Sequence, residues 1–283
     1  MSGNQIDLSN IEVQKASGET EPFSVEKLIG SLESTGAHPN EIAQIVQNIS
    51  GWIYNGVTTR HIYRRAYHLL QQKRNHLASR YKLKKAIMEL GPTGFPFEHF
   101  VAKIFDAMGF STLTGQVMNG CCVTHEMDVV AIKGKEEHLI ECKYGKSPGK
   151  SVSVQVPLYV RSRVNDVIKK QKESAEFDGF TFHGWVVTNT RFTSDATDYG
   201  KCSGLHLLSW DYPAGKGMKD IIDREKIYPV TVLASLTDKQ KQFLLEQDVV
   251  ICRQLIQEKE LINELDLPIK QFRYLMNELG EIT

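Results

Sequence analysis

The 283-residue sequence predicts a multidomain protein of the α+β and α/β classes. Between residues 95 and 211, helical stretches alternate with short β-branched runs, the order expected when helices cover a mixed sheet. On both sides of this region, apolar residues recur at the spacing of amphipathic helices. A chain of this length also commonly folds as more than one domain. We therefore expect a small, mostly helical N-terminal domain, a central mixed sheet flanked by helices, and a C-terminal helical bundle.

Turn-forming segments mark the boundaries between these domains. Gly91-Pro-Thr-Gly94 interrupts the helical pattern before the central region, and Tyr228-Pro229 follows the last predicted strand. The predicted segments are an N-terminal domain at residues 1–74, a basic linker helix at 75–94, the central domain at 95–228 and the C-terminal domain at 229–283.

The N-terminal domain is predicted to begin with a short strand at Ile11–Val13 and a turn at Ser17-Gly18. Ser24 is a candidate N-cap for the first helix, because its hydroxyl can accept a backbone hydrogen bond there. Pro39 suits the start of a second helix. Thr58 or Thr59 is the candidate cap of a third.

The central domain is predicted to begin with a helix that contains Phe97 and Met108 and ends at Gly109. Two strands follow, a further helix spans about Pro157 to Lys172, and two more strands complete the pattern. The four predicted strands are Met127–Ile132, His138–Cys142, Gly184–Thr188 and Leu205–Leu208. The tail from 236 to 283 carries apolar residues at helical spacing throughout.

The composition excludes several classes of protein. Hydrophobic residues make up 41% and charged residues 24%, which is typical of a globular chain rather than a disordered or fibrous one. No run approaches the roughly 20 apolar residues of a membrane-spanning helix, and the start lacks the pattern of a signal peptide. The five cysteines form no CxxC pair, so neither a disulfide framework nor a zinc cluster is predicted. We expect a cytoplasmic protein without a membrane partner.

The formal net charge is zero, but the charges are unevenly distributed. From Ile42 to Met88 there is no Asp or Glu among 47 residues, while nine are Lys or Arg and three are His. Such a stretch attracts phosphate groups. A charge run usually indicates a solvated helix face. For this stretch, a solvated face and a phosphate-facing surface are equal alternatives.

The residues best suited to catalysis lie in the two strands that follow the first central helix. Side chains alternate along a strand, so Glu141 and Lys143 point to one face and Cys142 to the other. If the two runs form a hairpin, Asp128 reaches the same place. Two carboxylates with carbonyl or water oxygens suit Mg²⁺ or Mn²⁺, and Lys143 can orient water or stabilise negative charge on a phosphodiester in its transition state.

Five ordered pieces of sequence over about 115 residues resemble the Mrr-type branch of the PD-(D/E)xK restriction-endonuclease-like superfamily. They are Phe95-Pro-Phe-Glu-His-Phe-Val with Met108-Gly109-Phe110, Met127-Asp128-Val-Val, Ile140-Glu141-Cys-Lys143, Gly184-Trp-Val-Val-Thr-Asn-Thr-Arg-Phe-Thr-Ser-Asp-Ala196, and Leu205-His-Leu-Leu-Ser209. The resemblance implies a restriction-endonuclease-like fold, metal ligation by Asp128 and Glu141, and a role for Lys143 as catalytic base or charge stabiliser.

The same resemblance identifies two further candidate catalytic residues. Glu98 matches a helix acid that supports the metal site, although an acid in the first turn of a helix also interacts favourably with the helix dipole. Gln155 and Tyr159 match a Gln-x-x-x-Tyr spacing, with Gln155 as the candidate site residue and Tyr159 expected in the core. His125 is a candidate metal ligand, with an ordinary polar loop residue as the alternative.

The N-terminal region resembles the ATP-cone, a regulatory nucleotide-binding domain. The matching segments are Val13-Gln-Lys15-Ala-Ser-Gly18, Pro22-Phe23-Ser-Val-Glu-Lys27-Leu28 and Val57-Thr-Thr-Arg-His-Ile62. Ala16 and Ser17 stand where that family has arginine and aspartate. The resemblance implies that ATP or dATP binds through Lys15, Gly18, Phe23 and Lys27 as a regulatory ligand, and a small helical domain without a ligand is the alternative.

The sequence thus predicts a Mg²⁺- or Mn²⁺-dependent endonuclease that acts on double-stranded DNA and is regulated by a purine nucleotide. Because cutting both strands usually needs two active sites, we expect a homodimer or a larger homo-oligomer. The alternatives are a nucleotide-sensing DNA-binding regulator without cleavage activity and a nuclease of RNA or single strands. The C-terminal tail weakly resembles a helix-hairpin-helix bundle, and an oligomerisation or docking element is the competing interpretation.

Overall fold

The computed structural model describes residues 11–15, 18–33, 35, 37–73, 75–147 and 149–283, with side chains at 71, 73, 75–80 and 259 outside the description. The chain forms two compact units, an N-terminal unit at Met1–Leu83 and a C-terminal unit at Lys84–Thr283. None of the helices among the described residues is both long and apolar enough to cross a membrane.

The N-terminal unit packs three helices with a small sheet. Its strands β1 (Glu12–Gln14), β2 (Thr20–Pro22) and β3 (Val57–Thr58) lie in the order β2-β1-β3. The helices are α1 (Val25–Glu33), α2 (Pro39–Ser50) and α3 (Thr59–Lys73), and α4 (Asn75–Met88) follows.

The predicted helix starts in this unit are confirmed. Ser24 Oγ accepts a hydrogen bond from the Lys27 amide at 3.1 Å, and Thr58 Oγ1 accepts one from the His61 amide at 3.2 Å. Pro39 occupies the first turn of α2, where its missing N–H has no cost. Ser17, predicted to lie in a turn, is outside the described residues.

A mixed sheet forms the centre of the C-terminal unit, as predicted, but it has five strands rather than the four expected. The strands β4 (Ser111–Asn119), β5 (Thr124–Lys133), β6 (Glu136–Lys143), β8 (Thr181–Thr188) and β10 (His206–Leu208) lie in the order β10-β8-β6-β5-β4. The β4–β5 and β5–β6 pairs are antiparallel, while β6–β8 and β8–β10 are parallel. The short β7 (Ser151–Val152) and β9 (Arg191–Phe192) pair separately in parallel.

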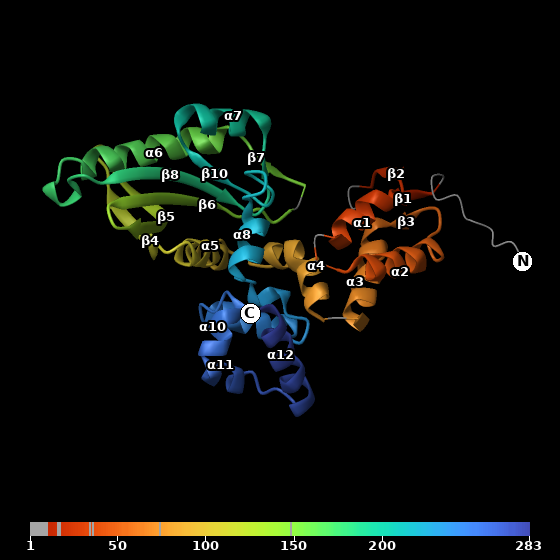
Figure 1. Ribbon diagram of the computed structural model, residues 1–283. Helices are drawn as coiled ribbons and strands as arrows, with labels where there is room; N and C mark the ends of the chain where they lie inside the picture. The colour runs from red at the N-terminus through yellow and green to blue at the C-terminus, as the bar shows by residue number, and fades with distance from the viewer. Residues whose placement is uncertain (1–10, 16–17, 34, 36, 74, 148) are drawn as a thin grey trace, which may run out of the picture. The chain divides into compact units, whose positions relative to one another are not determined.

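Helices cover both faces of this sheet (Figure 1). α5 (Phe95–Ala107) lies against one face, and α6 (Gln155–Gln171) with α7 (Ser194–Ser203) lies against the other. The core beneath α6 joins Val160 and Val164 of the helix to Leu139 and Val186 of the sheet. Gly184 lets α6 approach closely, because a Cβ there would lie 3.0 Å from Val164 Cγ1.

The rest of the unit is helical, as predicted for the tail. The helices are α8 (Met218–Glu225), α9 (Asp238–Glu246), α10 (Cys252–Gln257), α11 (Lys259–Glu264) and α12 (Ile269–Ile282), with short 3₁₀ turns at Ala175–Phe177 and Val230–Val232. The sequence did not predict β4 or α8. β4 is an edge strand whose apolar Leu113 and Val117 are exposed, so it lacks the usual alternation between buried apolar and exposed polar residues.

Candidate active site

The β5–β6 hairpin brings Asp128 and Glu141 together, as the sequence predicted. Val129 pairs with Ile140, so Asp128 and Glu141 come one residue beyond that pair on neighbouring strands. The Cys142 amide donates a hydrogen bond of 2.6 Å to Asp128 Oδ2. This bond fixes one oxygen of Asp128 beside the strand that carries Glu141.

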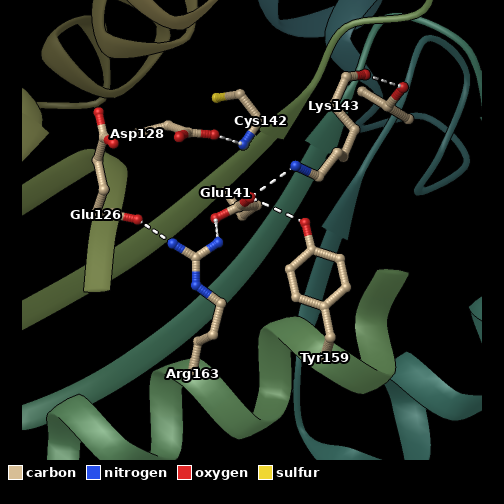
Figure 2. A network of polar contacts seen from close by, with 8 residues as sticks. Glu126, Asp128, Glu141, Cys142, Lys143, Tyr159 and Arg163 are labelled. Carbon is tan, nitrogen blue, oxygen red and sulfur yellow. Dashed lines mark hydrogen bonds and ion pairs between the residues drawn. The ribbon is translucent and has the colours of Figure 1, made fainter. Parts of the chain in front are cut away.

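Glu141 is the centre of a network of polar contacts (Figure 2). Lys143 Nζ lies 2.7 Å from Glu141 Oε1, and the Tyr159 hydroxyl donates to the same oxygen at 3.0 Å. Arg163 donates to Glu141 Oε2 at 2.8 Å. Because only 4% of Glu141 is exposed, these partners compensate a charge that would otherwise be costly to bury.

Two of these partners come from α6, and the sequence did not assign them to the site. Tyr159 was expected in the core, which is wrong: 38% of the residue is exposed and its hydroxyl contacts Glu141. Arg163 follows one turn later on the same helix face, and it also donates to the carbonyl oxygen of Glu126. The four-residue spacing of Gln155, Tyr159 and Arg163 places them on one face of α6. The sequence does not show that this face lies toward Glu141, because that depends on tertiary packing.

Gln155 begins α6 and is exposed. Among the described residues, no hydrogen bond joins Gln155 to Asp128 or Glu141. Its assignment to the site therefore stays a prediction.

Glu98 lies in the first turn of α5 and is half-buried. Burial, together with the negative charges of Asp128, Glu126 and Glu141, raises the pKa of Glu98 to about 7. Burial and the charge of Glu141 also raise the pKa of Asp128 to about 6, although the hydrogen bond from Cys142 acts in the opposite direction. The structure therefore brings Glu98 into the electrostatic environment of the hairpin acids.

Lys143 is held in its charged form. Burial lowers its pKa, but hydrogen bonds from the ammonium to Glu141 and Tyr159 outweigh burial, so the net pKa is raised. Cys142 points to the opposite face of the strand and is buried, and this burial raises the pKa of its thiol.

Two of these side chains carry the oxygen ligands that a divalent cation prefers. Asp128 and Glu98 are partly desolvated carboxylates that repel one another, and a hard cation would relieve that repulsion. Both oxygens of Glu141 already accept hydrogen bonds from other side chains. In the described part of the chain, no three His, Cys, Asp or Glu side chains are grouped so that they could hold a metal ion. Because both Glu141 oxygens accept hydrogen bonds, Asp128 could bind a cation more readily than Glu141. Glu141 would first have to lose one of its hydrogen-bond donors.

His125 lies on β5 and pairs with a carboxylate. Its Nε2 is 2.9 Å from Asp166 Oδ2 on α6, and the Cys122 and Val123 amides donate to the same carboxylate. The hydrogen bond from His125, with those from Cys122 and Val123, lowers the pKa of Asp166 to about 2. This arrangement attaches the β4–β5 turn to α6, which is a structural role for His125.

The residues predicted to bind nucleotide lie together in the N-terminal unit. Lys15 Nζ is 3.1 Å and Lys27 Nζ is 3.0 Å from the same Oε2 atom of Glu21. Gly18 has a φ of +89°, which suits a tight turn, while Ala16 and Ser17 lie outside the described residues. Phe23 and Lys27 line a cavity of about 150 Å³. That volume is smaller than the roughly 300 Å³ at which small-molecule sites begin, and Glu21 lies between the two lysines.

Comparison with known proteins yields two family matches. A family described as restriction endonuclease matches residues 92–212, and one described as AF1548-like, C-terminal, matches residues 228–283. An uncharacterised protein from Archaeoglobus fulgidus is 31% identical over 184 residues, which cover 64% of this chain and 99% of the relative.

Two solved structures are also similar. The crystal structure of AF1548, described as a protein of unknown function, is 30% identical with a TM-score of 0.54, covering 67% of this chain and 98% of that one. The MspJI restriction endonuclease in complex with a 27-mer oligonucleotide is 15% identical with a TM-score of 0.31, covering 75% of this chain and 44% of that one. The second likeness is too distant to carry an argument.

Proposed function

This chain belongs to the family of AF1548-like proteins with a restriction endonuclease domain, and on that premise we propose that it is a metal-dependent endonuclease that hydrolyses double-stranded DNA. The observation that carries the proposal is the hairpin that holds Asp128 opposite Glu141, with the Lys143 ammonium 2.7 Å from Glu141. Holding a buried Glu141 beside the partly buried Asp128 and Lys143 on two central strands of the sheet is costly for stability, and phosphodiester hydrolysis needs both kinds of group.

The raised pKa of Lys143 favours one of its two predicted roles. A lysine that stays protonated at neutral pH cannot accept a proton from water, so we assign it to stabilising the negative charge that develops on the phosphate. Asp128 and Glu141 would hold Mg²⁺ or Mn²⁺, with Glu98 in support. Such an ion, when bound, lowers the pKa of water and withdraws charge from the phosphodiester.

Tyr159 and Arg163 are positioning residues in this proposal. Both donate hydrogen bonds to Glu141, and Arg163 also holds the backbone of β5 through the Glu126 carbonyl. They therefore fix the Glu141 carboxylate in one orientation relative to Lys143. Gln155, at the exposed start of the same helix, is proposed to contact the substrate.

We further propose that ATP or dATP regulates the enzyme by binding the N-terminal unit. Lys15 and Lys27 converge on one point, which Glu21 occupies, and phosphate is the ligand chemistry that two converging ammonium groups suit. Gly18 and Phe23 complete the proposed pocket. Isothermal titration of ATP and dATP into wild-type protein and Lys27→Ala tests this directly: equal heats from both proteins would contradict it.

The decisive test of the nuclease is cleavage of duplex DNA with Mg²⁺ or Mn²⁺. We expect Asp128→Asn to abolish cleavage, while Lys169→Ala, an exposed lysine on α6, leaves the rate unchanged. Parallel reactions with single-stranded DNA and RNA separate a duplex-specific enzyme from a nuclease of other substrates. Mass measurement in solution tests the homodimer that cutting both strands implies.

One observation favours a second function, a nucleotide-sensing DNA-binding regulator without cleavage. Glu141 is fully engaged by Lys143, Tyr159 and Arg163, so an ion must displace one of them. This alternative predicts DNA binding that responds to nucleotide, with no cleavage in any divalent metal. A cleavage signal that disappears in Asp128→Asn would exclude it.

A further inference from the structure

A second groove in the N-terminal unit is lined by basic and aromatic side chains. It has a volume of about 350 Å³ and lies between the end of α2 and one face of α3. Among the described residues, no Asp or Glu lines it. The residues that define this basic groove are Asn48, Trp52, His61, Arg64, Arg65 and His68.

The basic groove is separate from the cavity proposed for nucleotide. Ile62 and Tyr63 of α3 line the nucleotide cavity, whereas Arg64 and Arg65 line the basic groove. Arg64 and Arg65 are therefore not part of the nucleotide cavity. The arginines of α3 are therefore available to a different anionic ligand.

Arg65 is held in place before any ligand binds. Its Nε donates a hydrogen bond of 3.0 Å to Asn48 Oδ1, and its guanidinium lies 4.7 Å from the centre of the Trp52 ring. Trp52 in turn meets the edge of Tyr54, of which 53% is exposed. A guanidinium fixed in this way loses less conformational entropy when it binds phosphate.

The charge surrounding the groove favours a polyanion. No acid occurs between Ile42 and Met88, so intrahelical pairing cannot neutralise the exposed Arg64. The groove residues His61 and His68 are seven positions apart on α3, or about 10 Å along the helix at 1.5 Å per residue. A row of that length can contact more than one phosphate of a nucleic-acid strand.

We infer that the basic groove binds the sugar–phosphate backbone of the DNA on which the C-terminal unit acts. This inference rests on the proposed function, because it takes duplex DNA as the substrate. It assigns Arg64 and Arg65 to the phosphates, which fits the two-pronged donor geometry of guanidinium. Contacts to the backbone carry no base preference, so the groove contributes affinity without sequence specificity.

The test measures binding of a fluorescent duplex by the full chain at several salt concentrations, in a Lys143→Ala background with EDTA present so that the duplex is not cut. We expect the double variant Arg64→Ala/Arg65→Ala to weaken binding of unrelated duplexes equally. The slope of log K against log salt should fall by about 1 per arginine. Arg64→Lys, which keeps the charge, should retain most of the affinity, and Lys82→Ala, outside the groove, should bind as the background does.

Circular dichroism checks that each variant is folded. We expect the fold to be retained, because Arg64 is exposed and Asn48 remains in place. An unchanged affinity and salt slope in the folded double variant overturns the inference, as does an equal loss in Lys82→Ala. A loss confined to free ATP binding overturns it too, because the groove is then a nucleotide site. The proposed nuclease activity is tested separately, by measuring cleavage with the chain that retains Lys143.

Discussion

His138 provides a prediction about how stability depends on pH. It lies on β6 with 7% of its surface exposed, and the Trp185 indole donates a hydrogen bond of 2.8 Å to its Nδ1. The Phe110 ring lies 4.6 Å away by centroid. Burial, followed by the charges of His183 and His206, lowers the pKa of His138 from 6.5 to about 4.

The depressed pKa sets both the sign and the size of the effect. Below pH 6.5 the unfolded chain takes up a proton at this position that the folded chain rejects, so folding loses stability as the pH falls. The loss is about 1.4 kcal/mol per pH unit and continues until the folded residue titrates near pH 4. The difference between the two pKa values limits the total to about 3 kcal/mol.

The assay compares urea unfolding of wild-type protein and His138→Gln between pH 7.5 and 4.5 in metal-free buffer, followed by tryptophan fluorescence. The comparison is needed because Glu98 and Asp128, whose pKa values are raised, stabilise the fold as the pH falls and would mask His138. They are present in both proteins and cancel in the difference. Below pH 6.5 the free energy of unfolding of wild type should fall steadily relative to that of His138→Gln. Parallel stability curves for the two proteins refute the reasoning.

Three further predictions concern the site and its scaffold. Tyr159→Phe removes the hydroxyl that donates to Glu141. It should lower the cleavage rate by up to about tenfold, because one hydrogen bond contributes about 1 kcal/mol. The melting temperature should change little. Gly184→Ala places a Cβ 2.7 Å from Leu205 Cδ2 and should cost about 1–3 kcal/mol in thermal unfolding. The control Gly280→Ala meets nothing within 4 Å and should not destabilise. EDTA should abolish cleavage and added Mg²⁺ or Mn²⁺ should restore it, whereas persistent cleavage in EDTA contradicts the metal requirement.

The β5–β6 hairpin that carries the candidate site was predictable because the sequence signals for it are local. Strand alternation places Glu141 and Lys143 on one face, and the short turn between the strands brings Asp128 beside them. Helix starts at Ser24, Pro39 and Thr58 were predictable for the same reason, since a cap depends on neighbouring residues only.

The features that were missed depend on long-range packing. Arg163 reaches Glu141 only because α6 turns that face toward the sheet, which spacing alone does not determine. β4 escaped prediction because Leu113 and Val117 are exposed on an edge strand. In the N-terminal unit, the sequence identified Lys15 and Lys27 but not Glu21, the acid that both lysines contact.

The single-turnover rate at which Lys143→Ala cleaves duplex DNA tests the central claim most directly. In saturating Mg²⁺ or Mn²⁺, the account predicts a loss of about 10²–10³-fold relative to wild type, the effect of removing one group that stabilises transition-state charge. Binding of the same duplex should be retained, because Lys143 acts on the reacting phosphate. Equal cleavage rates in wild type and Lys143→Ala would contradict the account.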